Sequence, residues 1–400
     1  MSSNRPAISV NLLRNLFVAG CAVEGEVELD IRQLQQDNVE EVHVKLKGIA
    51  KTEITRDKIT DKQTIHLVRD DASIWTRGTV YPLPGSDTLR VPFCLQLPPD
   101  LPPSFHYRAG DKSASIMYSV TAVGVRPGAF HFNRRVRQPL ALVQKADGAG
   151  IKAREELATL ASTGAEPTWR TGSQEEKIRR GLWGDYATVE VRCLIPDISP
   201  LPLFVPIPFV IKVKTITPPL TRAKADAHPP DKPIFPPPPS SYGMLEFKLK
   251  RKIFVRTHVF NDRASTDVHL FSTARDAAVD VEVPEKQWLS CETGSEKAKK
   301  PDGKGVWVQH ATFRGTIRLD CPPTFGLDII KCEYYLSLRV PFPGLGNDVK
   351  VTMPIMLSSG IETPIVRDDP RSSTHGAPDF LDLPPAYWDA NNRDWDDNKD

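Results

Sequence analysis

Strict alternation of apolar and polar residues recurs through most of this chain and limits its fold more than any other feature. Between residues 23 and 31, Val23, Val27 and Leu29 share one parity while acidic residues take the other. A strand places successive side chains on opposite faces, so this pattern predicts one face in a core and one in water. Similar patterns predict further strands at 42–48, 91–98, 115–125, 131–137 and 140–144.

The strands of the first 145 residues are expected to form antiparallel sheets. Parallel strands need crossover connections, usually helices, and residues 8–145 contain no sustained helical period. The turn-prone Gln-Gln-Asp-Asn segment at 35–38 is expected to connect the first two strands. Sheets of this kind bury their apolar faces against one another, so this region is predicted to be a β-sandwich.

Changes in composition divide the rest of the chain. Residues 146–183 are rich in Ala, Gly and charge and are predicted to be a connector. Strand patterns resume over 184–359, interrupted by a Pro-rich insert at 218–241 that is expected to be a mobile loop. Gly-Leu-Gly-Asn-Asp at 344–348 predicts a hairpin turn in this second domain. Residues 360–400 lack apolar periodicity and are predicted to be a disordered tail.

Charge and apolar content narrow the class of protein. Lys plus Arg total 52 against 50 acidic residues, a formal charge of +2, so no global field favours nucleic acid. The sequence shows neither a signal-peptide pattern nor an apolar run long enough to span a membrane. A cytoplasmic protein with at most peripheral membrane contact is therefore expected. Its isolated cysteines are expected to be buried reduced thiols: Cys21, Cys94, Cys193, Cys291, Cys321 and Cys332.

No sequence pattern predicts an active site, a metal site or a cofactor site. The chain lacks HExxH and GxSxG, and Gly303-Lys304 is followed by Gly305 where a phosphate-binding loop needs Ser or Thr. His106 is isolated and is predicted to be a surface or capping residue. We therefore predict that the protein is not an enzyme and has no cofactor.

A basic run at 248–252 has two interpretations. Lys248, Lys250 and Lys252 share one side of a predicted strand. They form a candidate patch for anionic lipid headgroups or acidic cargo. The alternative is a solvated sheet face on which the lysines protect an edge.

The clearest short motif lies near the C-terminus. A PPxY sequence is formed by Leu383, Pro384, Pro385, Ala386 and Tyr387. WW domains bind such segments because the prolines hold a polyproline II backbone at little entropic cost and the tyrosine enters a neighbouring pocket. The motif is predicted to be accessible in the tail. Pro-Pro-Pro-Pro-Ser-Ser-Tyr at 236–242 has an extra residue before its tyrosine and is interpreted as linker.

Several segments in the first half resemble the arrestin N-terminal domain. They include the alternating strands at 23–31 and 42–48. In that domain, a loop of the form Leu-Pro-x-x-Leu-Pro-Pro-Ser-Phe precedes a strand of the form Ile-x-Tyr-x-Val-x-Ala. The matching residues are Leu97, Pro98, Leu101, Pro102, Pro103, Ser104 and Phe105, then Ile116, Tyr118, Val120 and Ala122.

The second half resembles the end of the arrestin C-terminal domain, where a strand, a Pro-Gly hairpin and a final strand close the sheet. The matching residues are Tyr335, Leu336, Val340, Gly344, Pro354, Ile355 and Leu357. The resemblance implies an all-β protein with two immunoglobulin-like antiparallel sandwiches, at 1–145 and 184–359, and a disordered C-terminal tail.

The PPxY tail is similar to that of fungal α-arrestins, also called arrestin-related trafficking adaptors. This resemblance implies a cytoplasmic adaptor that is transiently at the plasma membrane or endosomes. Its tail would recruit the WW domains of a HECT-type ubiquitin ligase, and its sandwiches would engage cytoplasmic segments of a membrane transporter or receptor. Ubiquitin transfer and endocytosis of the cargo would follow. Many fungal members carry two or more PPxY motifs, whereas this chain has one, so recruitment would lack avidity.

Two other functions are compatible with a β-sandwich chain. One is an arrestin-fold scaffold in ambient-pH signalling or endosomal sorting, with partners on the sandwich surfaces and an accessory tail. The more distant one is a carbohydrate-binding module or β-sandwich enzyme. The latter requires a signal peptide or a carboxylate and aromatic cluster on one sheet face, and the sequence shows neither.

Overall fold

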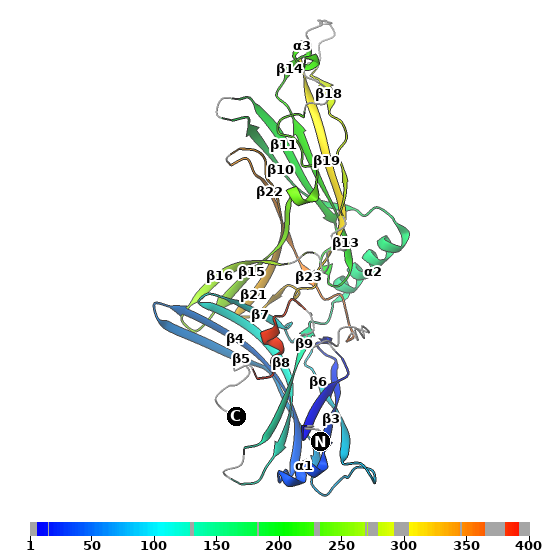
Figure 1. Ribbon diagram of the computed structural model, residues 1–400, viewed down its shortest axis with the longest axis vertical. Helices are drawn as coiled ribbons and strands as arrows, with labels where there is room; N and C mark the ends of the chain where they lie inside the picture. Colours follow the sequence, from blue (N-terminus) through cyan, green and yellow to red (C-terminus); the bar gives the residue numbers. More distant parts are fainter. Residues whose placement is uncertain are drawn as a thin grey trace, which may run out of the picture.

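The computed structural model describes residues 6–14, 16–128, 132–181, 184–227, 233–268, 270, 279–291, 304–344, 346–364 and 381–391. Two β-rich domains follow one another along an elongated molecule (Figure 1). The strands pair almost entirely in antiparallel fashion, which confirms the predicted all-β class and the antiparallel sandwiches. Parallel pairing occurs between β2 (Leu16–Val18) and β9 (Arg134–Val143), and between β12 (Leu201–Pro202) and β23 (Leu357–Ser358).

The N-terminal domain packs two sheets around one core. The smaller sheet has the order β1 (Ile8–Leu12), β3 (Ala22–Asp30), β6 (Thr88–Gln96). The larger sheet has the order β2, β9, β8 (Lys112–Val125), β4 (Glu41–Arg56), β5 (Ile59–Thr76), with β7 (Phe105–Ala109) paired to β8. A short helix α1 (Ile31–Gln36) links β3 to β4, which lie in different sheets. The 35–38 segment therefore connects the sheets and forms no hairpin.

Burial along these strands follows the alternation in the sequence. On β3, Val23, Val27 and Leu29 are fully buried, and on β4 the same holds for Val42, Val44 and Leu46. The strands predicted separately at 131–137 and 140–144 are one continuous strand, β9, and residue 131 lies outside the described residues.

Besides the short β12–β23 pair, the described part of the C-terminal domain contains two larger sheets. The larger has the order β10 (Trp169–Arg179), β11 (Tyr186–Pro196), β13 (Pro206–Ile216), β19 (Lys304–Arg318), β14 (Leu220–Thr221). Two short strands, β17 (Asp280–Glu282) and β18 (Gln287–Ser290), also pair with β19. The smaller sheet has the order β16 (Asn261–Val268), β15 (Glu246–Arg256), β21 (Ile330–Val340), β20 (Phe325–Gly326), with β22 (Val349–Ile355) paired to β21. β21 and β22 form the predicted hairpin, with Val340 opposite Val349.

The predicted connector at 146–183 is wrong in two respects. It contains helix α2 (Gly148–Thr163), and its last part is β10, which pairs with β11 along its whole length. The Asp147 side chain accepts a hydrogen bond from the Gly150 N–H at 2.8 Å, and Gly164 ends the helix with a φ of 67°. Since this segment supplies a capped helix and a sheet strand, it is a structural part of the fold.

The described part of the Pro-rich insert is packed and does not match the predicted mobile loop. It contains β14 and helix α3 (Arg222–Asp226), and a 3-10 helix η1 (Tyr242–Met244) follows it. Ile234 is 3% exposed, and the Arg180 guanidinium lies 5.6 Å from the centre of the Phe235 ring. Residues 228–232 of the insert lie outside the described residues.

A related Pro-Pro-(Ser/Thr)-Phe segment occupies the same structural role in both sandwiches. The Tyr118 hydroxyl donates to the Pro102 carbonyl at 2.7 Å, and the Tyr334 hydroxyl donates to the Pro322 carbonyl at 2.7 Å. Each tyrosine is buried on a central strand of its sheet. The two segments consist of Leu101, Pro102, Pro103, Ser104 and Phe105, and of Cys321, Pro322, Pro323, Thr324 and Phe325.

The hydroxyl residues of the two segments also bind a neighbouring chain segment in the same way. The Leu142 N–H donates to Ser104 Oγ at 3.0 Å, and the Leu357 N–H donates to Thr324 Oγ1 at 3.0 Å. The two segments meet at the domain boundary, where the Phe105 ring packs edge-on against Phe325 with centroids 5.3 Å apart.

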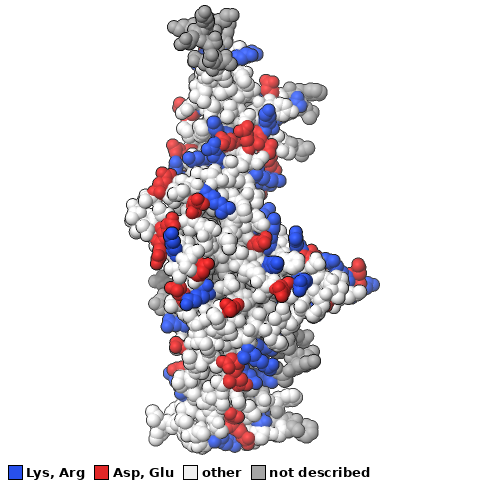
Figure 2. All heavy atoms as spheres, turned by 180° about the vertical axis from the view of Figure 1, so that it is seen from behind, with Lys and Arg blue, Asp and Glu red and all other residues white. Residues whose placement is uncertain are grey.

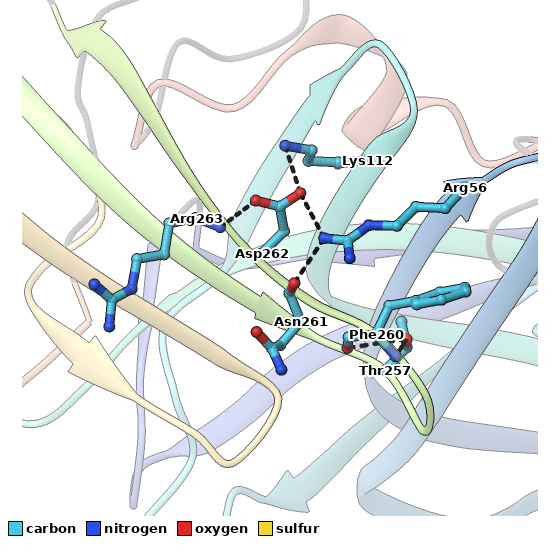
Figure 3. A network of polar contacts seen from close by, with 7 residues as sticks. All are labelled: Arg56, Lys112, Thr257, Phe260, Asn261, Asp262 and Arg263. Carbon is cyan, nitrogen blue, oxygen red and sulfur yellow. Dashed lines mark hydrogen bonds and ion pairs between the residues drawn. The ribbon is translucent and has the colours of Figure 1, made fainter.

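A polar network fixes the two domains where the β4–β5 hairpin lies beside the β15–β16 hairpin (Figures 1 and 3). Lys112 Nζ of β8 lies 2.7 Å from Asp262 Oδ2 of β16, and Arg56 Nη2 of β4 lies 3.1 Å from the same oxygen. Arg56 Nη2 also donates to the Asn261 carbonyl at 2.9 Å. The hydrogen bond from Lys112 is the main cause of a lowered pKa for Asp262, which keeps this carboxylate charged.

We expect Asp262→Asn to lower the stability of the domain interface by about 1 kcal/mol, because a partly exposed ion-pair network contributes on this scale. A carboxylate whose pKa is lowered by folding stabilises the protein above its ordinary pKa of 3.8, and this contribution is lost as the pH falls through the lowered value. Denaturant unfolding of the wild type and of Asp262→Asn at several pH values measures the difference in their free energies of unfolding. Equal stability at neutral pH, or a difference that grows in acid, would contradict it.

Candidate functional site

The described part of the C-terminal tail, residues 381–391, packs against the N-terminal domain. We call this segment the docked tail. It contains the short helix α4 (Pro385–Trp388), drawn in red beside the strands of that domain in Figure 1. Tyr387 of the PPxY motif is completely buried. The prediction that the motif is accessible in the tail is therefore wrong for this arrangement of the chain. Residues 365–380 and 392–400 lie outside the described residues.

The Tyr387 hydroxyl is held by three groups of the N-terminal domain, which we call the tail site. It lies 2.7 Å from Ser104 Oγ, 2.8 Å from the Leu140 carbonyl oxygen and 3.4 Å from the Tyr118 backbone nitrogen. A carbonyl oxygen only accepts, so the Tyr387 proton is directed to Leu140. The tyrosine oxygen then accepts from the Ser104 hydroxyl and from the Tyr118 N–H.

The tail site bridges two strands of the larger N-terminal sheet. Tyr118 on β8 and Leu140 on β9 are opposite each other in the strand register. The Tyr387 hydroxyl contacts the N–H of one and the carbonyl of the other. Burial raises the pKa of Tyr387 well above its usual range, so the phenol stays protonated and remains a hydrogen-bond donor.

Apolar side chains on both sides of the motif add to the docking. Leu381 is 0% exposed and Leu383 is 6% exposed. The Trp388 ring packs edge-on against Tyr387 with centroids 5.2 Å apart, and Arg137 Nη1 donates to the Ala390 carbonyl at 3.2 Å. The docked tail is thus anchored by a leucine three residues before the first proline of the motif as well as by the tyrosine.

The docked tail also reaches the domain boundary. Asp382 Oδ2 lies 3.9 Å from Nη1 of Arg251, which projects from β15 of the C-terminal domain. The Arg251 side chain is 8% exposed, and its guanidinium lies 5.3 Å from the centre of the Phe105 ring. Within the described residues, Arg251 Nη1 has no hydrogen-bond partner. The tail therefore brings a carboxylate to a buried arginine charge that the two domains enclose.

The three candidate lysines lie on the exposed face of β15, as the alternation predicted. The structure places other groups beside them. Lys248 Nζ lies 2.9 Å from Asp267 Oδ2, and Lys252 Nζ lies 4.0 Å from the centre of the Tyr335 ring. Lys250 stands opposite Asp267 and Tyr335 on the neighbouring strands. This arrangement favours the solvated-face interpretation over an anion-binding patch, and the lipid-binding role stays an untested hypothesis.

The charged surface shows little segregation by sign. Acidic and basic side chains are interspersed on the face shown in Figure 2. Within the described ranges, His, Cys, Asp and Glu side chains form no group of three or more that could hold a metal ion. No helix in the described part of the chain is both long and apolar enough to cross a membrane.

The cysteines are free thiols, but only three of them are buried as expected. Burial raises the pKa of Cys193 and Cys321 to about 12 and of Cys332 to about 11, so these thiols stay protonated. Cys94 and Cys291 are exposed, which corrects the prediction for these two. His106 lies on β7 and is half-buried.

Sequence reasoning found Tyr387 but missed the groups that receive it. Ser104 and Tyr118 were noted only as part of a family resemblance, and Leu140 only as a strand residue. The spacing of apolar residues in an acidic tail, at Leu381, Leu383 and Tyr387, was a signal that this segment contains a buried face.

Comparison with known protein families bears on the domain that contains the tail site. Residues 7–149 match the family model described as "Arrestin (or S-antigen), N-terminal domain". A search of curated proteins found no match. The matched region runs from β1 into α2 and includes all three residues of the tail site. The first sandwich is therefore similar to arrestin N-terminal domains, and this match supports a relationship to the arrestin family.

Proposed function

We propose that this protein is a non-enzymatic adaptor of the α-arrestin type. Its PPxY motif binds a WW domain of a HECT-type ubiquitin ligase, and its sandwiches bind the cytoplasmic segment of a membrane transporter or receptor. The ligase then transfers ubiquitin to the cargo, which is taken up by endocytosis. The protein acts in the cytoplasm and transiently at the plasma membrane or endosomes. The arrestin N-terminal domain in residues 7–149 supports the adaptor class.

The observation that carries the ligase half of the proposal is the sequence of residues 383–387. It holds the two prolines and the tyrosine that a WW groove recognises. The docked tail pairs with no strand in the described part of the chain, and the Tyr387 side chain makes hydrogen bonds to Ser104 and Leu140 of the N-terminal domain. Because it is not part of a sheet, the docked tail can leave the tail site without breaking strand pairing. A WW domain can bind the motif only after this release.

We expect a peptide of residues 379–393 to bind isolated ligase WW domains, and Tyr387→Ala in this peptide to weaken binding by roughly 30- to 150-fold. Loss of a buried aromatic anchor costs about 2–3 kcal/mol in such interfaces. Fluorescence anisotropy of the labelled peptides measures this. The matched control is Asp389→Ala, which changes an exposed residue outside the motif. Equal binding by the wild-type and Tyr387→Ala peptides would refute the role of the motif.

The burial of Tyr387 favours one second candidate, a signalling or sorting scaffold in which the tail is a structural part of the N-terminal domain. Proximity labelling in cells separates the two functions. A HECT-type ligase and transporters among the labelled proteins support the first. Endosomal sorting or ambient-pH signalling components without a ligase support the second.

A further inference from the structure

We propose that the arrestin N-terminal domain contains a dedicated binding site for this chain's own PPxY segment, and that this site and a WW domain compete for Tyr387. The site consists of Ser104, Tyr118 and Leu140, and its ligand is the docked tail. The inference rests on the proposed function for the identity of the competitor, and it assigns to that function a closed state and an open state.

The polar groups of the tail site match a phenol hydroxyl. A donor from Ser104, a donor from the Tyr118 backbone and an acceptor from Leu140 converge on one buried oxygen at 2.7, 3.4 and 2.8 Å. The single donor and two acceptor positions of the tyrosine are thereby all used. A phenylalanine ring would leave all three groups without this partner, and such buried polar groups are costly. The site therefore selects tyrosine over phenylalanine.

The apolar anchors extend recognition beyond the PPxY core. Leu381 and Leu383 are buried while Pro385 and Ala386 between them and Tyr387 are exposed. The site thus recognises a Leu-x-Leu-Pro-Pro-x-Tyr segment by its leucines and its tyrosine. A WW groove, in contrast, contacts the prolines and the tyrosine. The two binding modes share Tyr387 but use different neighbours.

The two modes also require different backbones. In the docked tail the chain turns helical at Pro385, the first residue of α4, and Tyr387 N–H donates to the Pro384 carbonyl at 2.8 Å. A WW ligand holds both prolines in an extended polyproline II conformation. A motif that is helical at its second proline and has its tyrosine buried therefore cannot bind a WW domain without leaving the tail site.

Competition sets the expected affinity. A ligand that binds only one of two states has its apparent dissociation constant raised by the inverse of that state's population. If the tail is docked about 90% of the time, the full chain binds a WW domain about 10-fold more weakly than the free tail peptide does. A substitution that weakens the docking without changing the motif should therefore raise the WW affinity of the full chain to that of the free peptide.

Two substitutions are designed to weaken the docking, one in the docked tail and one in the tail site. Leu381→Ser changes the buried anchor, which lies outside the PPxY core, and Ser104→Ala removes the hydroxyl that donates to Tyr387. Both full-length variants are expected to bind a WW domain within about 2-fold of the affinity of the free peptide. Leu289→Ser is the matched control, because the same change is made at a leucine that is 50% exposed on β18 of the other domain. It should bind like the wild type.

The experiment compares titrations of one ligase WW domain with the four full-length proteins and with tail peptides with and without Leu381→Ser. Thermal unfolding confirms that each full-length protein is folded. Equal affinity of the peptide and the wild-type chain, together with no gain in either docking variant, would overturn the inference. A Leu381→Ser gain that also occurs in the peptide would overturn it too, because the effect would then lie in the WW contact.

The docking itself is tested separately by measuring the rates of amide hydrogen exchange of residues 381–391 in the absence of a WW domain. Leu381→Ser should speed exchange of the Tyr387 amide, and unchanged exchange would overturn the existence of the site. If the free peptide binds no ligase WW domain, the proposed function and the competition both fail, while the docking site still stands or falls by this exchange measurement.

Discussion

Replacing Tyr118 by alanine is expected to lower the free energy of unfolding of the N-terminal domain by about 3–5 kcal/mol. Tyr118 is completely buried on β8, and its hydroxyl donates to the Pro102 carbonyl at 2.7 Å. The substitution creates a large cavity and leaves a buried carbonyl without its donor. It also disturbs the strand position that supplies one group of the tail site.

Denaturant unfolding, followed by a probe in the N-terminal domain, measures this loss, since a two-domain chain need not unfold in one step. Tyr118→Phe keeps the ring and should lose only about 1–2 kcal/mol. Tyr186→Ala is the exposed control, because Tyr186 is 51% exposed. A Tyr118→Ala protein as stable as this control would show that the packing around Tyr118 is wrong.

Replacing Gly48 by valine is expected to cost about 3 kcal/mol, the upper end for an overpacked core. A Cβ at this position of β4 would lie 2.6 Å from Cε1 of Tyr118 and 2.7 Å from Cγ1 of Val68. Contacts this short do not occur, and the buried ring has no room to move away. The glycine is therefore required by the close approach of the Tyr118 ring to the strand.

The same denaturation experiment compares Gly48→Val with Gly243→Val, where a Cβ would meet no atom within 4 Å. Combining Gly48→Val with Tyr118→Ala should cost less than the sum of the two single changes, because the cavity receives the new methyl groups. Strict additivity would mean that the two residues do not share this space.

The alternation in the sequence predicted the longer half-buried strands of the first domain, such as β3, β4 and β8, but it missed the short strands β1 and β7 and the long strand β5. β5 was missed because it is an edge strand paired only with β4, and most of its residues are exposed or half-buried on both sides. Apart from the buried Trp75, its apolar residues pack only partly against the core, and they change parity between Leu67 and Val68, so the strand carries no strict period of two. α2 was missed because the face that it buries consists of Gly150, Ala153 and Leu157, whose helical spacing gives only a weak apolar signal since two of the three residues are small.

The sequence predicted only one part of the candidate site, because the site consists of a ligand segment and of the groups that bind it. The ligand, residues 383–387, is contiguous and was recognisable from its residue types. Its receiver combines a loop residue, Ser104, with backbone groups of Tyr118 and Leu140 on two strands. Backbone groups leave no trace in residue types, so no sequence pattern indicates that they converge. Composition suggested an open tail, and three buried side chains in that tail reversed this expectation.

Hydrogen exchange of the N-terminal domain, measured while a WW domain is added to the wild-type chain, is the most direct test of competition for Tyr387. The Tyr118 N–H donates to the Tyr387 hydroxyl when the tail is docked. If the WW domain withdraws the motif, this amide should exchange faster, although the WW domain itself contacts only the tail. A WW domain that binds the full chain and leaves exchange at Tyr118 unchanged would contradict the competition.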